Sequence, residues 1–360
     1  MDALNMRGGR KLAEGGYGCI FDPPLICHGK KIRAKANMIG KLTDTEEIAG
    51  EITAAKILKN TPEANNYFIL PELDTMCEDV RVKDQTEPQL RTCDVLLEHG
   101  MRNLVHYHIK NGGQSLYNKL DSIQIEVKEF PFYRFMKHVL EMGTYLAFKG
   151  IIHNDLHSGN MVVDDKYNFR LIDFGRSYTV SGISNDTIDG LDASYDASLG
   201  QIPPEYTVQD GEKMGMQLPV IIQDIIQNKR SLKFAERVFG HNRVEQMNEF
   251  KKFWKTSNSV KSGNFVKFWK YYWPAVDAWG FGSMLVSTLY KLSLSNQFMK
   301  SSEWKQKSPI IKTIVTGLLQ CSPVKRLDCV EALALYDPTN AFVLSSSGKA
   351  WLEKKHAKRA

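Results

Sequence analysis

Short apolar runs recur through the first third of the chain, and glycines or polar clusters separate them. Runs of this kind are typical of strands that are joined by tight turns. We therefore expect a strand, a glycine turn and a strand over residues 12–21, and further strands at 37–42, 67–70 and 104–109. The polar segment 74–102 is predicted to be a surface insertion.

Apolar positions at helical spacing mark two longer segments. One helix is predicted from about residue 43 to 59, and a second from 130 to 149, where Gly150 supplies a natural C-terminal stop. Two short apolar runs at 161–163 and 169–172 flank a polar turn, and this pattern predicts a hairpin.

Strand signals are missing from Ser198 onward, so we expect the second half of the chain to be helical. The fold class that follows is α+β, with a strand-rich N-lobe at about residues 1–110 and a mainly helical C-lobe at about 111–340. The last residues, 341–360, are expected to form a basic tail in solvent.

The composition fits a folded chain: of 360 residues, 42% are hydrophobic and 24% are charged. The apolar runs are far shorter than the roughly 20 residues that cross a bilayer, and the first residues lack the apolar block of a secretory signal. A cytoplasmic location is therefore expected. The net charge of +6 permits a polyanionic ligand without requiring one. Because the six cysteines contain no Cys-x-x-Cys pair, we expect reduced thiols rather than a zinc site or disulfides.

Clustered glycines make the first candidate binding element. They lie at the tip of the expected hairpin, where backbone N–H groups can approach phosphate oxygens because no Cβ is in the way. Glycine-rich turns are common, so this stretch alone is a weak signal. The candidate nucleotide-binding residues here are Leu12, Ala13, Glu14, Gly15, Gly16, Tyr17, Gly18 and Ile20.

Lys41 and Glu51 form the second candidate group. A lysine on a buried strand neutralises the α- and β-phosphates of a nucleotide if a carboxylate on the neighbouring helix fixes it. Lysine–glutamate pairs are abundant, however, and Lys35 or Glu47 could take these places instead.

The strongest signal lies in residues 153–175. His153-Asn154-Asp155-Leu156-His157-Ser158-Gly159-Asn160 is followed, after the predicted hairpin, by Asp173-Phe174-Gly175. Two acids and an amide at this spacing offer one proton acceptor, Asp155, and two oxygen ligands for Mg²⁺, Asn160 and Asp173. Phosphoryl transfer requires these three roles. The alternative is that they are only turn residues, and it leaves the acids beside two apolar strands unexplained.

With these motifs in place, the chain resembles the protein kinase family. The glycine stretch, Lys41, Glu51, the catalytic loop at 153–160 and Asp-Phe-Gly at 173–175 follow the order of the family's motifs. The resemblance covers about residues 12–335. It implies a two-lobed protein-kinase-like fold, ATP as the phosphoryl donor, Mg²⁺ or Mn²⁺ as the cofactor, and serine or threonine hydroxyls of proteins as the acceptors.

Motifs in the second half extend the resemblance. Pro203-Pro204-Glu205 is similar to the motif that closes the family's activation segment, Asp277 begins a stretch similar to its buried helix, and Arg326 stands where an arginine pairs with that glutamate. We therefore expect a Glu205–Arg326 ion pair. The span from Glu205 to Asp277 is longer than the family's usual link, which implies an insertion at about 207–270.

The resemblance also suggests where adenine binds. Asn111-Gly112-Gly113 resembles the glycine pair after the family's hinge. This register puts adenine against the backbone near His108 and Ile109, with Tyr107 as the gatekeeper residue. Residues 98–101 form a competing hinge.

Two residues of the catalytic loop depart from the family. Asn154 stands where most members have an arginine that binds phosphate on the activation loop, so we expect activity without phosphorylation of that loop. His157 replaces a lysine that neutralises the γ-phosphate, and it either donates to that phosphate or only hydrogen-bonds within the loop. The same loop, with Glu-Gly-Gly-Tyr-Gly, looks like divergent kinases of large cytoplasmic DNA viruses, which implies a place in the host cytoplasm or the virion.

Protein substrates are the expected partners, but other functions stay open. Small-molecule kinases of the aminoglycoside or choline type have similar catalytic loops, and a pseudokinase would act as a scaffold. Lysines and aromatic residues interleave over 250–273, a pattern that suits nucleic acid, an acidic substrate or a membrane surface. For this stretch we favour an amphipathic helix whose aromatic residues pack on the C-lobe.

Overall fold

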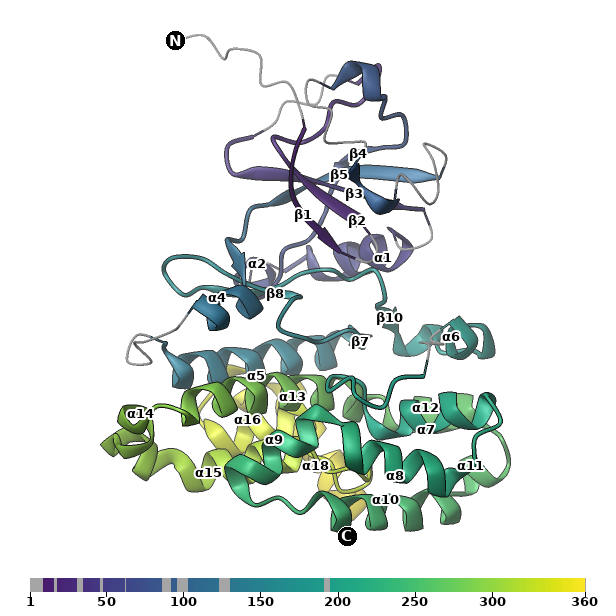
Figure 1. Cartoon of the computed structure of the whole chain (residues 1–360), viewed down its shortest axis with the longest axis vertical. Coiled ribbons are helices and arrows are strands. Elements are labelled where there is room, and N and C mark those ends of the chain that lie inside the picture. The colour runs from purple at the N-terminus through teal and green to yellow at the C-terminus, as the bar shows by residue number, and fades with distance from the viewer. Residues whose placement is uncertain are drawn as a thin grey trace. The chain divides into compact units, whose positions relative to one another are not determined.

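The computed structural model describes residues 9–15, 18–30, 35–45, 48–61, 63–85, 92–95, 103–122, 130–190 and 195–359. The chain divides into two compact units, and Figure 1 labels their elements where there is room. The first unit comprises Met1–Gln114 and Val162–Ser177, and the second comprises Ser115–Met161 and Tyr178–Ala360. The segment Val162–Ser177 therefore belongs with the strand-rich part of the chain, although it lies beyond the boundary that the sequence predicts near residue 110.

The first unit is built on a five-stranded sheet in the order β1-β2-β3-β5-β4, in which all neighbours are antiparallel. Its strands are β1 (Arg10–Gly15), β2 (Gly18–Asp22), β3 (Met38–Asp44), β4 (Glu72–Cys77) and β5 (Leu104–Lys110). β1 and β2 form the expected hairpin, which closes with Gly15 opposite Gly18. The strands expected around 37–42 and 104–109 are also present, as β3 and β5.

The predicted strand at 67–70 is wrong. α2 (Ala64–Tyr67) occupies its start, and Phe68 forms only an isolated bridge to Leu171. The strand of this region, β4, begins at Glu72 instead. An apolar run predicts burial without naming the partner. Here the burial comes from packing against residues 162–177, not from a place in the main sheet.

Two apolar clusters cover the two faces of the sheet. α1 (Ile48–Leu58), the helix expected over 43–59, packs against β5 on one face. The cluster on the other face consists of Cys19, Phe21, Leu25, Cys27, Leu42, Cys77, Val80, Cys93, Val95 and Leu104. Because successive side chains of a strand point to opposite faces, the second apolar face needs a cover. The described part of 74–102 supplies it, so the expectation of a surface insertion there is wrong.

Four of the six cysteines form disulfides in this second cluster. Cys19 of β2 is bonded to Cys93, and Cys27 is bonded to Cys77 at the end of β4, with Cα–Cα distances of 6.0 and 6.2 Å. The expectation of reduced thiols is wrong for these residues. The partners lie 74 and 50 residues apart in the sequence without a motif, so only the fold brings them together. The free cysteines, both buried, are Cys321 and Cys329.

A short hairpin leads to the Asp-Phe-Gly segment. β8 (Met161–Val163) and β9 (Phe169–Leu171) are the predicted pair, and the carboxylate of Asp164 accepts backbone N–H groups of the turn between them. After β9, Phe174 is fully buried and packs edge-on against Phe68, with 5.8 Å between the ring centroids. The Asp-Phe-Gly segment is thus anchored in the first unit. The first unit also holds η1 (Val82–Asp84).

The second unit is mainly helical, and β7 (Ile151–Ile152) pairs antiparallel with β10 (Tyr178–Thr179). β6 (Gln114–Ser115) lies where the two units meet along the chain. The helices are α4 (Leu116–Ser122), α5 (Phe132–Lys149), η4 (Val180–Gly182), α6 (Asn185–Gly190), α7 (Pro204–Lys213), α8 (Leu218–Asn228), α9 (Arg230–Phe239), α10 (Arg243–Thr256), α11 (Asn258–Lys261), α12 (Phe265–Tyr272), α13 (Pro274–Ser293), α14 (Asn296–Lys300), α15 (Ser302–Leu318), α16 (Cys329–Tyr336), α17 (Ala341–Leu344) and α18 (Ser346–Arg359).

Several expectations for the residues of the second unit are confirmed by these elements. α5 ends at Gly150, which has the left-handed φ of 62° that glycine adopts without steric cost. From Ser198 onward, every element in the described part of the chain is a helix. None of the described helices combines the length and the apolar character that crossing a bilayer requires.

The lysine- and aromatic-rich stretch 250–273 spans α10 to α12. Its buried aromatic residues are Phe250, Trp254, Phe268 and Trp269, and its exposed lysines include Lys252, Lys255, Lys267 and Lys270. These four aromatic side chains therefore face the interior of the second unit, while the lysines face water. This is the amphipathic packing that the sequence favours. The segment expected as an insertion at 207–270 consists of most of α7, then α8 to α11, and most of α12.

Candidate active site

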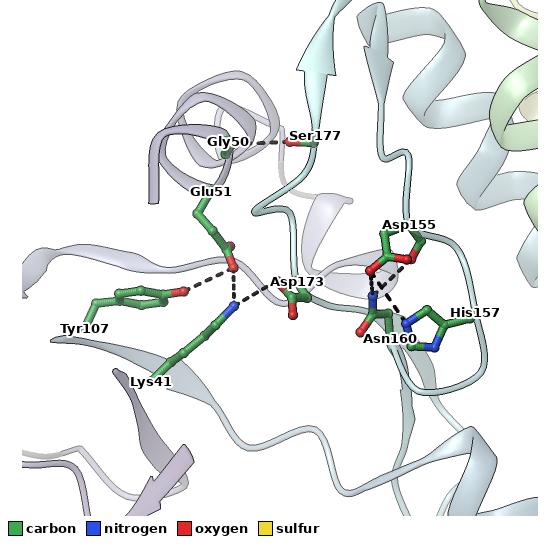
Figure 2. A network of polar contacts seen from close by, with 9 residues as sticks. All are labelled: Lys41, Gly50, Glu51, Tyr107, Asp155, His157, Asn160, Asp173 and Ser177. Carbon is green, nitrogen blue, oxygen red and sulfur yellow. Dashed lines mark hydrogen bonds and ion pairs between the residues drawn. The ribbon is translucent and has the colours of Figure 1, made fainter. Parts of the chain in front are cut away.

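Lys41 is the centre of a buried polar cluster in the first unit. Its Nζ donates to Glu51 Oε1 of α1 and to Asp173 Oδ1, both at 2.8 Å. Tyr107, opposite Lys41 on β5, donates its hydroxyl to the same Glu51 oxygen at 3.1 Å. Figure 2 shows Lys41 reaching between the two carboxylates. Lys41 thus pairs with Glu51 in the structure, and the alternative Glu47 lies outside the described residues.

The electrostatics of this cluster keep the lysine charged. Burial by itself would lower the pKa of Lys41, but the carboxylates of Asp173 and Glu51 outweigh it and hold that pKa well above its usual value. Burial, together with the neighbouring Glu51 carboxylate, raises the pKa of Tyr107 well above its usual value. Tyr107 therefore acts as a neutral donor and Lys41 as a cation.

Gly50 brings α1 against the Asp-Phe-Gly segment. A Cβ at Gly50 would lie 2.4 Å from the carbonyl oxygens of both Phe174 and Gly175, so only glycine permits this approach. Ser177 Oγ donates to the Gly50 carbonyl at 3.3 Å, which adds a second tie between the segments. The sequence reading missed Gly50, although a glycine inside a predicted helix is the signal that could have found it.

Asp173 has a strained backbone, with φ at 65°. A non-glycine residue rarely adopts this left-handed conformation, and it persists only where the surroundings fix it. The buried Phe174 and the ion pair with Lys41 supply that fixation. The packing of Phe174 and the ion pair with Lys41 thus hold the Asp173 carboxylate in the buried cluster around Lys41.

Asp155, Asn160 and His157 come together in the second unit, around the loop that precedes β8. Asn160 Nδ2 donates to both the backbone oxygen and Oδ2 of Asp155, each at 3.0 Å. Gly159 N–H donates to His157 Nδ1 at 3.0 Å, and His157 Nε2 lies 3.6 Å from Asp155 Oδ2. The loop therefore fixes the orientation of both polar side chains that flank Asp155 (Figure 2).

Asp277 of α13 stabilises the backbone at the start of this loop. Its carboxylate accepts the backbone N–H groups of His153 at 2.8 Å and Asn154 at 3.0 Å. Burial raises the pKa of Asp277, and the contacts with His153 and Asn154 oppose this rise. Asn154 has the left-handed φ of 65°, so the carboxylate stabilises a strained turn directly before Asp155.

Lys229 is a polar residue of the second unit that sequence reasoning missed. It lies fully buried between α8 and α9, and its Nζ donates to the carbonyl oxygens of Leu199 and Ile202 at 3.2 and 3.1 Å and to Thr207 Oγ1 at 2.9 Å. Burial lowers the pKa of Lys229 to about 8. A lysine between two helices looks like a surface charge in the sequence, so no local signal could have identified it.

The glycine hairpin is described only in part. Gly16 and Tyr17 lie outside the described residues, whereas Leu12, Ala13, Glu14 and Gly15 form β1, and Gly18 and Ile20 belong to β2. A Cβ at Gly18 would lie 2.5 Å from the Leu42 carbonyl, so this glycine serves the packing of β2 on β3. Glu14 Oε1 accepts the backbone N–H of Asp94 at 2.6 Å.

His108 and Ile109 lie within β5, which continues to Lys110. The His108 backbone N–H donates to Thr75 Oγ1 at 2.8 Å, and Ile109 is buried in the cluster beneath α1. Part of the segment expected to be a hinge is thus engaged in the sheet. The competing hinge at 98–101 lies outside the described residues.

The donor atoms of these residues suit a hard divalent cation. Asp173 offers carboxylate oxygens. The amide nitrogen of Asn160 is hydrogen-bonded to Asp155, so its amide oxygen is the atom that can act as a ligand. Oxygen donors of these two kinds are the ligands that Mg²⁺ prefers in proteins. The residues therefore fit the expected metal in their chemistry.

Comparison with known proteins gives a distant relationship. No protein-family model matches the chain. A serine/threonine-protein kinase, pim-2 of Danio rerio, is 23% identical over 199 residues, which are 55% of this chain and 58% of the relative. The chain thus matches somewhat more than half the length of that relative. This similarity supports a kinase-type function, and an antiparallel sheet followed by a mostly helical region is compatible with a kinase-like fold.

Proposed function

We propose that the chain is an ATP- and Mg²⁺-dependent protein kinase that transfers the γ-phosphate to serine or threonine hydroxyls of proteins. The observation that carries the proposal is the double ion pair of Lys41 with Glu51 and Asp173. A lysine that is buried, charged and fixed by a helix carboxylate is suited to binding nucleotide phosphates. The similarity to a serine/threonine kinase supports the same function.

Each candidate residue has a defined role in this proposal. Asp155, oriented by Asn160, accepts the proton of the substrate hydroxyl. Asp173 and Asn160 would hold Mg²⁺, and that ion would offset negative charge that develops on the phosphates. Lys41 and the glycine hairpin hold the phosphates of the nucleotide.

His157 acts through the loop in this proposal. Because its Nδ1 accepts the Gly159 N–H, the imidazole proton lies on Nε2 and points toward Asp155. A Cβ at Gly159 would lie 2.6 Å from the imidazole Cε1, so glycine at this position leaves room for the ring. Of the two roles that the sequence left open, we therefore propose hydrogen bonding within the loop.

We further propose that activity does not need a phosphate on the segment before Pro203. The carbonyl oxygens of Leu199 and Ile202 are bonded to Lys229, and that of Gly200 accepts Trp279 Nε1 at 2.8 Å. Uncharged backbone atoms are thus held by buried side chains of the helices. This anchoring takes the place of the arginine–phosphate contact that Asn154 cannot make.

The test is transfer of radiolabelled phosphate from ATP to a panel of basic proteins, acidic proteins and small alcohols. We expect the Asp155→Asn and Asp173→Asn variants to lose at least about 100-fold in rate. Asp165→Asn, an exposed acid in the turn between β8 and β9, is the matched control and should keep its activity.

The outcomes separate the alternatives. Undiminished transfer by Asp155→Asn would refute the proposed base. Transfer to small alcohols but to no protein would identify a small-molecule kinase. A wild-type protein that transfers no phosphate but still binds partner proteins would be identified as a scaffold.

A further inference from the structure

A cavity of about 610 Å³ lies within the second unit, apart from every residue assigned above. Its walls come from the end of α12, the start of α13, the loop after Cys321 and the last helix, α18. A volume of this size is typical of sites for small ligands. Nothing in the proposed phosphoryl transfer uses it.

The polar character of this cavity is basic. Four lysines line it, namely Lys270, Lys325, Lys354 and Lys355, and no carboxylate does among the residues that the structure describes. Lys355 is paired with Asp328 at 2.9 Å and Lys325 with Glu249 at 2.8 Å. Within the described part of the chain, Lys270 and Lys354 have no such acidic partner, and both are exposed. The cavity therefore attracts an anion.

Aromatic side chains also line the cavity, together with two prolines, Ala275 and Val324. Trp273 and Trp351 meet edge to face, with 5.6 Å between their ring centroids, and the Trp351 indole donates to Asp328 at 2.9 Å. Tyr271, which is 52% exposed, lines the same cavity. An inorganic anion alone would leave these rings in contact with water. A ligand that carries a flat ring as well as a negative charge would cover them, since aromatic side chains stack on bases irrespective of sequence.

From this combination we infer that the cavity binds a nucleotide unit, with its phosphate at Lys270 and Lys354 and its base against the ring of Tyr271. The unit is either a free nucleotide or one residue of a single-stranded nucleic acid. An extended acidic peptide fits less well, because helices and one short loop form the walls and offer no strand edge for its backbone. This inference stands apart from the proposed phosphoryl transfer.

Calorimetric titration of the full chain with uridine monophosphate, uridine, inorganic phosphate and a short oligouridine tests it. We expect uridine monophosphate to bind more tightly than uridine or phosphate. In the double variant Lys270→Glu/Lys354→Glu its dissociation constant should rise about tenfold or more, because two attractive charges become repulsive. The matched control is Lys252→Glu/Lys255→Glu, which makes the same charge change on α10, outside the cavity.

A second variant tests the base contact without changing the charge. Tyr271→Ser should weaken the binding of uridine monophosphate about fivefold or more and leave the binding of inorganic phosphate unchanged. Tighter binding of the oligouridine than of the monophosphate identifies nucleic acid as the source, and equal binding identifies a free nucleotide. Both results support the inference.

Three results would overturn it: no measurable binding by wild type, equal binding to the wild type and the double lysine variant, or phosphate binding as tight as that of the nucleotide. Displacement of the nucleotide by a Glu-Tyr peptide of higher affinity would assign the cavity to acidic peptides instead. Phosphate transfer by the same variants is measured separately. The proposed kinase activity depends on Asp155 and Asp173, so its failure is distinguishable from failure here.

Discussion

Histidine 106 illustrates how one buried side chain ties stability to pH. It is fully buried on β5, its Nε2 accepts the Leu25 N–H at 3.2 Å, and its Nδ1 lies 3.7 Å from Cys27 Sγ. Burial, with a smaller contribution from His108, lowers the pKa of His106 from 6.5 to about 3. The side chain is therefore neutral in the folded protein at pH values well above 3.

We predict that His106 makes the protein less stable as the pH falls from 6.5 toward 3. The unfolded chain takes up a proton near 6.5 while the folded chain does not, so the free energy of unfolding falls by up to about 1.4 kcal/mol per pH unit in this window. Urea unfolding of wild type and His106→Gln at several pH values measures the effect.

The comparison isolates one group, because His108 and His241 also have lowered pKa values through burial and remain in both proteins. The stability difference between wild type and variant should shrink or reverse as the pH falls. A difference that stays constant between pH 7 and 5 would contradict the prediction.

The sequence indicated some of the important residues and gave no sign of others. Asp155, Asn160 and Asp173 stand out because their spacing is short and each is a type that binds protons or metal. Lys229 and His106 do not stand out, because their importance comes from burial among segments distant in sequence. Burial by distant segments leaves no local pattern.

At the scale of elements, α1 is positioned by the glycine in its first turn. We predict that Gly50→Ala reduces phosphate transfer by about tenfold or more, because a Cβ 2.4 Å from two carbonyl oxygens forces α1 away from Asp-Phe-Gly. The same change in an open helix would stabilise it by roughly 1 kcal/mol.

The rate of transfer and the melting temperature, measured on the same samples, test this prediction. Ala49→Gly, at the neighbouring position of α1, is a control that alters helix propensity without adding a Cβ. Full activity together with a raised melting temperature in Gly50→Ala would show that the approach has no functional role.

The glycine hairpin is tied to residues 92–95 by three contacts. Cys19 is bonded to Cys93, Lys11 Nζ donates to the Thr92 carbonyl at 2.6 Å, and Glu14 accepts the Asp94 N–H. We predict that Cys93→Ser lowers the free energy of unfolding by about 2–4 kcal/mol, since the disulfide closes a long loop. We also expect weaker binding of an ATP analogue, because the hairpin strands lose their anchor.

Cys77→Ser is the matched control, since it breaks the disulfide to Cys27, which lies outside the hairpin. It should cost stability without a comparable loss of nucleotide affinity. Isothermal titration with a non-hydrolysable ATP analogue gives the affinities. Equal losses of nucleotide affinity in the two variants would show that the disulfide between Cys19 and Cys93 has no specific role in nucleotide binding.

At the scale of the whole molecule, one buried ion pair joins α7 to residues near α16. Arg326 Nη1 and Nη2 donate to Glu205 Oε1 and Oε2 at 2.7 and 2.8 Å, and both side chains are 0% exposed. The guanidinium also lies over the ring of Trp279, 5.0 Å from its centroid. The expected pair is therefore present, and it links positions 121 residues apart.

We predict that Glu205→Gln lowers the free energy of unfolding by about 3–5 kcal/mol, because it leaves the buried charge of Arg326 without its carboxylate. Lys325→Gln breaks the exposed pair with Glu249 and should cost at most about 1 kcal/mol. Urea unfolding followed by tryptophan fluorescence measures both. Similar losses of unfolding free energy in the two variants would contradict the prediction that the buried ion pair contributes more than the exposed one.

The sequence by itself determined the strands β1, β2, β3 and β5, the helix α5 and its end at Gly150, the helical second half, and the candidate residues of the Asp155 loop. These features depend on local periodicity, turn residues and short spacing, which one stretch of chain contains. The tertiary structure alone decided the pairing of Cys19 with Cys93 and of Cys27 with Cys77, and which segment covers the second face of the sheet. It also decided the buried hydrogen bond from Lys229 to the Ile202 carbonyl. Each of these depends on segments that meet only after folding, and no local pattern records which segment will bury which.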